Sequence, residues 1–350
     1  MDLRIDPKLF HDFHFKIAMP LRLPATSRRI LEEFVDIDVN SEAVSKIVQR
    51  NQYFEYMLLQ EIKTLGLKEN TPGLQAAIAL LGMSRVRDFV CALQILRMVG
   101  RRHPEVGKDG KFTFKPSEMV KYAVKTEEYA LARQIPYADT AYAGGMMFDV
   151  MFAVARELFG DPDTFEDYAV EVYKHGLRTA LIGVEIGKSI KNFSYSKFVF
   201  SSCLIHDIGK LAMELLFPPT TPNSYLAFRE SVDEKPVRRL LKHYIEVKRF
   251  GLPHEYYSSQ MAFQFNIFRS IERAVLFHHD PYTLKSTNKD LYTFAALIGL
   301  ASNMANHYRN PKDANDPIVA SWITPELKDC KIELKTLMAV MQRVSTTSSI

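Results

Sequence analysis

Five histidines and one aspartate in the second half of the chain are of residue types that bind metal ions. They occur in a fixed order along the sequence: His175, the pair His206-Asp207, His254, and the pair His278-His279. Imidazole nitrogens and carboxylate oxygens are the usual protein ligands of Zn, Fe, Mn and Ni. The series therefore predicts a metal site whose ligands come from segments distant in sequence.

Two further charged residues share a helical face with members of this series. Lys210 lies four residues after His206, so its ammonium group could hold a phosphate oxygen beside a metal ion. Glu171 lies four residues before His175 and could be a further ligand or a partner of a ligating histidine. If the chain is an enzyme, we expect Lys210 and Asp207 to act in catalysis.

Each of these residues alone also has an ordinary structural explanation. A single histidine on an apolar helix is more often a core or surface residue than a ligand. The pair at 278–279 precedes Asp-Pro and could mark a helix end, where a protonated histidine favours the negative end of the dipole. The ordered combination is much more specific than its parts. The other histidines are expected at the surface, with His243 a reserve ligand if His254 points away: His11, His14, His103, His243 and His307.

The elements that must position these residues are predicted to be helices. Apolar residues recur at helical spacing in three early segments, 31–35, 44–48 and 53–62. Asn40 or Ser41 can cap the second of them. Alternating strand patterns are nearly absent, so we expect an all-α fold, a multi-helix array of stacked short helices with at most a minor β hairpin.

Breaks in the helical pattern divide the chain further. Pro72-Gly73 ends the third segment, and a long helix is expected from about Leu74. Residues 108–115 form the best strand pattern, which is short. Prolines at 217–236 predict a loop with at most a short helix inside it, and a final helix is expected near 325–344.

One segment echoes the His-Asp segment. Residues 144–159 resemble residues 202–217 at an offset of 58, with Asp149 aligned to Asp207 and Phe148 in place of the histidine. Two apolar helices that each contain an aspartate would explain the echo. A duplicated helix that lost its ligand would explain it too, and neither version would bind a metal.

Composition bounds the class of protein. The 350 residues suit one large or two modest domains, and 47% hydrophobic and 25% charged residues are typical of a globular protein. The net charge of +4 is spread along the chain, which gives no argument for nucleic acid binding. Cys91, Cys203 and Cys330 lie far apart in apolar runs, which predicts reduced thiols in a cytoplasmic protein. Neither a signal peptide nor an apolar run of about 18 residues is present, so no membrane span is expected.

The series through His175, LIHDIGK at 204–210 and FHHDP at 277–281 resembles the HD superfamily of metal-dependent phosphohydrolases. Residues 19–62 and 74–98, including Ala77-Ile78 and Leu81-Gly82, look like the opening of the HD-related output domain, HDOD. The resemblance covers roughly residues 18–310, and it implies an HD-type helical fold and a role in bacterial signal transduction. It divides the chain into an N-terminal extension 1–17, an N-terminal helical part 18–104, an insertion 105–165 with a candidate degenerate HD-like helix, an HD-like part 166–310, and a C-terminal linker and helix 311–350.

Three departures from these families affect the expected function. Gln60-Glu61 stand where many HDOD sequences have Asn-Ser, which suggests local repacking. HD hydrolases usually end their ligand set with an aspartate on a later helix, where this chain offers Ser302 and Asn303, neither of them anionic. The sequence HHDPYTLKST also lacks the Gly-Tyr-Pro motif of HD-GYP phosphodiesterases, which argues against cyclic dinucleotide hydrolysis.

Two classes of function follow from the resemblance. In the first, the chain is a signalling output domain that acts through protein contacts, with a degenerate metal site. In the second, it is a metal-dependent phosphohydrolase of the phosphodiesterase or nucleotidase class, or a nucleotide sensor that retains the pocket without turnover. The expected cofactor is a divalent transition metal (Fe, Mn, Zn or Ni) or none, and the expected partners are signalling proteins and a nucleotide or phosphate ligand. The sequence does not fix the oligomeric state.

Overall fold

The structure is a computed structural model in which part of the chain is described. The described residues are 7–14, 17, 29, 41–64, 73–98, 116–159, 163–221, 223–233, 239–265, 271–307, 319, 326 and 329–347. Within these ranges every regular element is a helix, which confirms the predicted all-α fold. No helix in the described ranges combines the length and the apolar character that a bilayer crossing needs. The strand candidate at 108–115 lies outside the described residues.

The chain divides into two compact units. Unit 1 comprises residues 1–18, 161–263 and 268–350, and unit 2 comprises residues 19–160 and 264–267. The helices of unit 2 are α3 (Ser41–Gln49), α4 (Gln52–Thr64), α5 (Leu74–Leu81), α6 (Met83–Met98), α7 (Pro116–Met119), α8 (Lys121–Ala132) and α9 (Ala138–Phe159). The finer domain boundaries that the sequence suggested stay predictions.

The helices of unit 1 lie on both sides of unit 2 in the sequence. They are α1 (Pro7–Phe13), α10 (Asp163–Gly187), the short 3-10 helix η2 (Ser196–Phe198), α11 (Val199–Ile205), α12 (Gly209–Leu216), α13 (Tyr225–Asp233), α14 (Arg239–Phe250), α15 (His254–Phe265), α16 (Glu272–Leu276), α17 (Tyr282–Lys285), α18 (Lys289–Asn306) and α21 (Leu334–Thr347).

Unit 2 begins with an apolar core shared by four helices. Side chains of α3, α4, α5 and α6 bury one another, with Val44, Leu58 and Ile78 among those that are almost completely inaccessible. The long helix expected from Leu74 is broken at Gly82, where φ is 78° and the backbone N–H bonds to the carbonyl of Ile78. Glycine adopts this left-handed conformation without the steric cost of a Cβ atom, so one predicted helix becomes two.

The helices α8 and α9 of unit 2 form an antiparallel pair in which Asp149 has a structural role. Its two carboxylate oxygens accept hydrogen bonds from the backbone N–H groups of Tyr122 and Ala123, each at 2.8 Å. These are first-turn N–H groups of α8, which have no partner within their own helix. Phe148 is fully buried beside them. Asp149, in the segment that resembles the His-Asp segment, therefore caps a helix.

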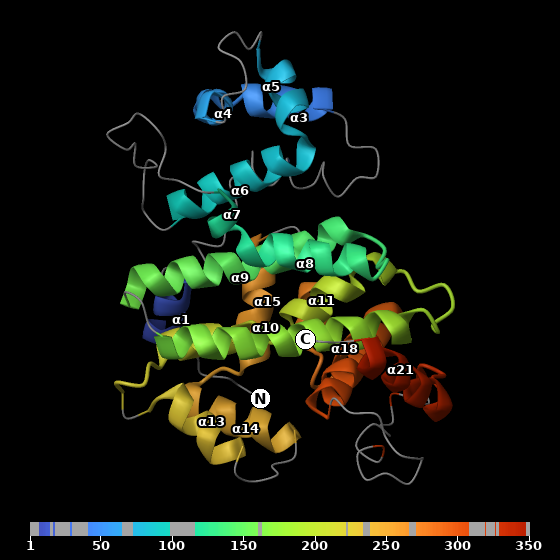
Figure 1. Cartoon of the computed structure of the whole chain (residues 1–350). Coiled ribbons are helices and arrows are strands. Elements are labelled where there is room, and N and C mark those ends of the chain that lie inside the picture. The colour runs from blue at the N-terminus through green and yellow to red at the C-terminus, as the bar shows by residue number, and fades with distance from the viewer. Residues whose placement is uncertain are drawn as a thin grey trace. The chain divides into compact units, whose positions relative to one another are not determined.

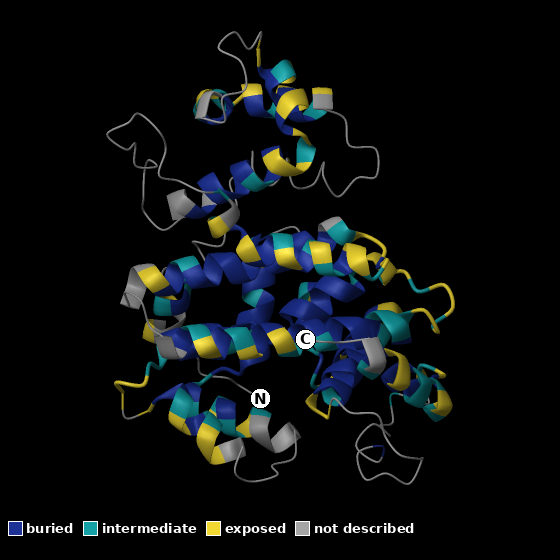
Figure 2. Cartoon of the chain, in the orientation of Figure 1, coloured by how far each residue is buried: buried dark blue, intermediate teal, exposed yellow. Residues whose placement is uncertain are grey.

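Unit 1 is organised around α10, α11 and α18. The long helix α10 packs against α11, α12, α18 and α21, and α18 also contacts α11, α16 and α17 (Figure 1). The helix α18 is capped by Asn288, whose side chain accepts a hydrogen bond from the N–H of Leu291, and most of the helix is buried (Figure 2). These three helices are the rigid frame on which the His-Asp series is mounted.

Two glycines let helices that carry the His-Asp series approach closely. A Cβ atom on Gly176 of α10 would collide with the carbonyl oxygen of Leu204 in α11. A Cβ atom on Gly209, the first residue of α12, would collide with the carbonyl oxygen of His254 in α15, and the Gly209 N–H donates to the Ser258 hydroxyl at 2.8 Å. Both contacts lie next to residues of the His-Asp series, so the glycines set the spacing of that series.

Candidate metal centre

The structure brings all six residues of the His-Asp series together within unit 1. His175 projects from the middle of α10, and His206 and Asp207 follow the end of α11. His254 is the first residue of α15, and the pair His278-His279 follows α16. Every one of them belongs to one of two groups whose ligand atoms lie within 4.8 Å of one another, and Asp207 is a member of both.

Asp207 stands between the two groups and turns one oxygen toward each. Its Oδ1 lies 3.0 Å from His254 Nε2 and 4.0 Å from His278 Nε2. Its Oδ2 lies 3.3 Å from His206 Nε2 and 3.5 Å from His175 Nε2, and it also accepts a short hydrogen bond from Lys210. Burial would raise the pKa of Asp207, but the neighbouring His206 and Lys210 hold it well below its usual range. The buried side chain is therefore a carboxylate.

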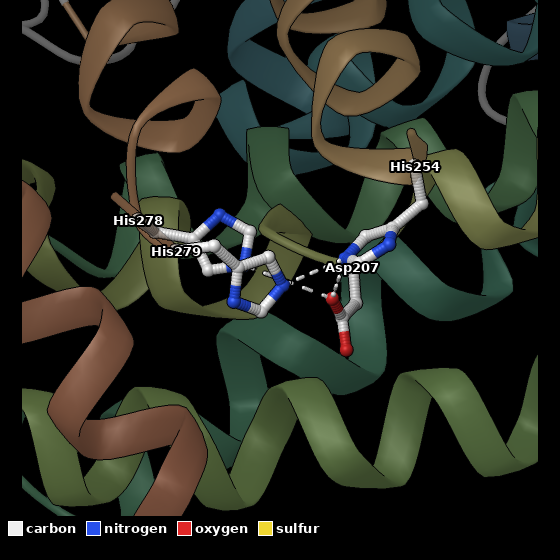
Figure 3. Close-up of side chains that lie close together, drawn as sticks. All are labelled: Asp207, His254, His278 and His279. Atoms are coloured by element: carbon white, nitrogen blue, oxygen red, sulfur yellow. Dashed lines mark hydrogen bonds and ion pairs between the residues drawn. The ribbon is translucent and has the colours of Figure 1, made fainter. Parts of the chain in front are cut away.

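The first group consists of Asp207, His254, His278 and His279, whose side chains point toward one another (Figure 3). His279 Nε2 lies 3.1 Å from His254 Nε2, close to the 3.0 Å that separates His254 from Asp207. Nitrogen and oxygen ligands of a tetrahedral metal ion, bound at about 2.0–2.1 Å, are about 3.3 Å apart. The group thus has the residue types and nearly the spacing of a three-histidine, one-carboxylate site.

Hydrogen bonds behind the rings fix the orientation of three histidines. Nδ1 of His206 donates to the carbonyl of Cys203 at 2.7 Å, and Nδ1 of His278 donates to the carbonyl of Val275 at 2.6 Å. Nδ1 of His254 faces a carboxylate oxygen instead, at 2.7 Å. Metal-ligating histidines almost always donate their second N–H in this way, which leaves Nε2 directed at the metal.

The carboxylate behind His254 belongs to Glu246 on α14, a residue that the sequence motifs did not reveal. Glu246 is fully buried, and its other oxygen accepts a hydrogen bond from the Tyr225 hydroxyl at 3.2 Å. Glu255, also buried, places an oxygen 3.4 Å from the same His254 Nδ1. Burial alone would lower the pKa of His254, but Glu246 and Glu255 outweigh it and raise that pKa to about 10.

These carboxylates give the region a surplus of negative charge. Asp207, Glu246 and Glu255 are three buried acids; the Lys210 ammonium bonds to Asp207, and His243, at the rim, contacts Glu255 closely. When the neighbouring imidazoles are neutral, these three acids outnumber the single Lys210 ammonium. Buried charge without compensation is costly, so the surplus favours either protonation of His254 or a bound cation.

In the second group, His175 and His206 with Asp207, a hydroxyl group contacts the histidines. The hydroxyl of Ser302 on α18 lies 3.0 Å from His206 Nε2 and 3.4 Å from His175 Nε2. Ser302 therefore lies at this group, where the sequence comparison placed the missing aspartate. Burial lowers the pKa of His175 to about 3, which makes this imidazole neutral. Side chains here are also more open, with His175 19% and Lys210 20% exposed.

The remaining candidates lie away from the cluster. Glu171 is 74% exposed, and its nearest cation is Arg229 at 3.8 Å. It shares a face of α10 with His175, but one helical turn separates the two and the structure does not bring Glu171 to the site. His243 is not needed as a reserve ligand, because His254 points into the cluster.

The residues present fit a divalent transition metal in the group that contains His254. Three histidines and one carboxylate are borderline ligands of the kind that Zn, Fe, Mn or Ni accept, and the surrounding acids offset the ionic charge. The fit on the His175 side is poorer, since one carboxylate oxygen already bonded to Lys210 is the only anionic atom there within the described residues. The structure supports a metal site and does not identify the metal.

Comparisons with known proteins find solved structures of low sequence identity. In solved structures the chain is similar to the "Putative phosphohydrolase" of Shewanella amazonensis SB2B, with 14% identity, coverage of 97% of this chain and 95% of that one, and a TM-score of 0.46. It is also similar to an HDOD domain protein of Geobacter sulfurreducens, with 15% identity, coverage of 94% and 93%, and a TM-score of 0.38. These TM-scores lie below 0.5, so we infer neither fold nor function from the likeness. Curated protein sequences give no significant match.

The sequence pattern of the HDOD domain family matches residues 150–281. This span contains His175, the His206-Asp207 pair, His254 and the His278-His279 pair, which are the residues that the structure gathers. The resemblance that the motifs suggested for residues 18–149 stays a prediction. Residues 150–281 of the chain thus match the HDOD domain family, the family that their motifs resemble.

Proposed function

We propose that this chain is a bacterial signalling output domain that acts through protein contacts and carries a metal-binding but non-hydrolytic HD-type centre. The HDOD match supports the signalling class, and the convergence of Asp207 with three histidines supports the metal centre. Cys91 and Cys203 are buried and form no disulfide, which supports the cytoplasmic setting that is part of the same proposal.

One observation carries the non-hydrolytic part of the proposal: a neutral hydroxyl, Ser302, contacts His206 and His175. A metal ion used in phosphoryl chemistry would polarise a phosphoryl oxygen and lower the pKa of a bound water. That chemistry needs ligands that hold the ion next to an accessible substrate. The His175 side of this cluster is partly accessible, and there Ser302 and Lys210 contact the polar atoms.

A phosphohydrolase is the second candidate function, and Lys210 is the observation that favours it. Its ammonium group lies against Asp207 and is partly exposed, so it could contact an incoming phosphate beside the buried histidines. In that reading Lys210 would bind substrate, and Asp207 would hold the metal.

The experiment that separates the two functions combines metal content with turnover. Untagged chain is purified and reconstituted separately with Fe, Mn, Zn and Ni, and each form is assayed with bis(p-nitrophenyl) phosphate and with nucleoside monophosphates. The proposal expects about one metal per chain, lost in the His206→Ala/Asp207→Ala double variant, and no hydrolysis above that of the variant. Hydrolysis that disappears with the variant would establish the enzyme, and a chain that binds none of the four metals would remove the metal centre.

The signalling part is tested separately from the metal part. The chain is crosslinked in its native cells, and the partners recovered with the natural chain are compared with those of a Tyr244→Ser variant. Tyr244 is an exposed aromatic residue on α14 and serves as a surface probe. A reproducible partner among signalling proteins supports the output role. Recovery of no specific partner, in cells where the chain is abundant, contradicts it.

A further inference from the structure

We infer that the cluster binds a single metal ion through Asp207, His254, His278 and His279, and that Lys210 and Ser302 replace a second cation on the His175 side. The inference rests on the proposed metal centre and adds to it the side of Asp207 on which the ion sits. Both groups of ligand atoms are tight enough for an ion, so distances alone do not choose between them. Charge and hydrogen bonding distinguish the two groups.

The hydrogen bonds on the His175 side already use the atoms that a metal would need. The Nδ1–H of His206 is committed to the Cys203 carbonyl, so Nε2 is the ring atom left to face a metal ion. The Ser302 hydroxyl lies 3.0 Å from this Nε2, within hydrogen-bond distance. A metal bound at His206 Nε2 would have to displace the hydroxyl, which is buried and would lose its partner.

The charge on the His175 side is already balanced. Asp207 Oδ2 is its anionic atom among the described residues, and the Lys210 ammonium bonds directly to that oxygen. A divalent ion added here would have no further carboxylate to offset its charge.

On the His254 side of Asp207, negative charge is in surplus. His254 is backed by Glu246 at 2.7 Å and by Glu255 at 3.4 Å, so two buried carboxylates lie behind one candidate ligand. Carboxylates in this position orient the imidazole and make it a stronger donor toward a metal. Together with Asp207 Oδ1 they supply the negative charge that a divalent cation requires.

The test is the stoichiometry and the location of bound Co²⁺ in the full untagged chain. Co²⁺ is used alone, with equilibrium dialysis to count ions and visible absorption to report four-coordinate binding. We expect one equivalent in the natural chain, unchanged affinity within about twofold in His175→Ala, and an affinity weakened by at least about 100-fold in His279→Ala, which removes a direct ligand. Ser302→Asp should add a second equivalent, and Ser302→Ala, which adds no charge, should not.

The outcomes separate this inference from the proposed function. Two equivalents in the natural chain, or one equivalent lost in His175→Ala and kept in His279→Ala, would overturn the inference and leave the metal centre standing. No bound Co²⁺ at all would overturn both. If circular dichroism shows that Ser302→Asp is unfolded, the comparison of His175→Ala with His279→Ala still decides the side, since both replace partly exposed side chains.

Discussion

At the scale of single residues, Glu246 shows how a side chain outside every motif can determine the properties of the site. It has no exposed surface, it accepts the hydrogen bond from His254 Nδ1, and it holds the Tyr225 hydroxyl with its second oxygen. Burial would raise the pKa of Glu246, but the charge of His254 lowers it overall. The Glu246 carboxylate therefore stabilises positive charge on His254 or on an ion that His254 binds.

Replacing this support should weaken metal binding without removing a ligand. In Glu246→Gln the amide can still contact His254, but the negative charge that strengthens the imidazole as a donor is lost. We expect Zn²⁺ affinity to fall by about 10- to 100-fold, measured by competition with a chromophoric chelator. Glu230→Gln on the surface of α13 is the charge-matched control and should bind Zn²⁺ as the natural chain does. Equal loss in both variants would show that net charge, and not the contact with His254, is responsible.

The sequence predicts the members of the site better than it predicts their surroundings. His206 and Asp207 are adjacent, and the other histidines stand in a recognisable order, so their types and spacing indicate a shared site. Glu246 precedes His254 by eight residues across a helix end, and no periodicity links the two. Glu171 lies four residues before His175, which gives the two a shared helical face, but a face does not specify position along the helix axis, and Glu171 is 74% exposed.

A second buried acid, Glu214 on α12, gives a pH-dependent prediction. Burial raises the pKa of Glu214, and the guanidinium of Arg229 only partly opposes this. A raised pKa in the folded state means that the group favours folding below its unfolded pKa, near 4.5, and that this contribution is lost as the pH rises through the folded pKa. Glu214→Gln should therefore be more stable than the natural chain at pH 7 and equally stable at pH 4. Urea denaturation at the two pH values measures this difference. A variant that is less stable at pH 7 would mean that the pairing with Arg229 outweighs burial.

At the scale of elements, the contact of α12 with α15 decides whether Asp207 and His254 can meet. The first residue of α12 is Gly209, which lies against the backbone of His254 and Ser258. Backbone atoms cannot move aside as a flexible side chain can, so any larger residue must separate the two helices.

Gly209→Ala should therefore cost stability and metal affinity together. We expect a loss of about 1–3 kcal/mol or more in the free energy of unfolding, the usual cost of overpacking, and weaker Zn²⁺ binding. The matched control is Gly187→Ala at the end of α10, where the nearest atoms would lie at 3.6 and 3.7 Å from the new Cβ. This control should be neutral or slightly stabilising, because alanine favours helix over glycine. Gly209→Ala with unchanged stability would show that the two helices are not held at this spacing.

A second prediction at the scale of elements concerns Asp149, which caps α8. Asp149→Ala would leave the buried N–H groups of Tyr122 and Ala123 without their acceptor, at a cost of about 2 kcal/mol or more. Asp149→Asn should recover part of the loss, and Glu128→Ala on the exposed face of α8 should have little effect. Thermal unfolding measures all three. Full stability in Asp149→Ala would remove the capping role.

The helices themselves were largely predictable, and their breaks were not. The segments expected at 44–48 and 53–62 are α3 and α4, and a short helix, α13, lies inside the proline-rich stretch as anticipated. The final helix begins at Leu334, later than the expected 325. Apolar spacing reports a helical face, whereas a break such as that at Gly82 depends on a backbone conformation that spacing does not encode.

At the scale of the whole molecule, the division into units bears on how metal binding affects the chain. Every residue of the two ligand groups, with Glu246, Glu255 and Ser302, belongs to unit 1. The HDOD match, at 150–281, begins inside α9 and so includes the last residues of that helix in unit 2. Sequence patterns could not place this division, because the division follows contacts between segments that are distant in sequence.

Hydrogen exchange with and without Zn²⁺ tests whether the units respond to the metal separately. Binding at 100 times the dissociation constant stabilises the bound unit by about 2.7 kcal/mol, which corresponds to about 100-fold slower exchange for amides that open only on its unfolding. We expect this slowing in α10 and α18 and no change in α3–α6, because the ligands all come from unit 1. His279→Ala, which lacks a ligand, controls for effects of Zn²⁺ elsewhere on the chain. Equal slowing in α3–α6 would mean that the two units unfold as one cooperative body, so that a metal ion in one stabilises both.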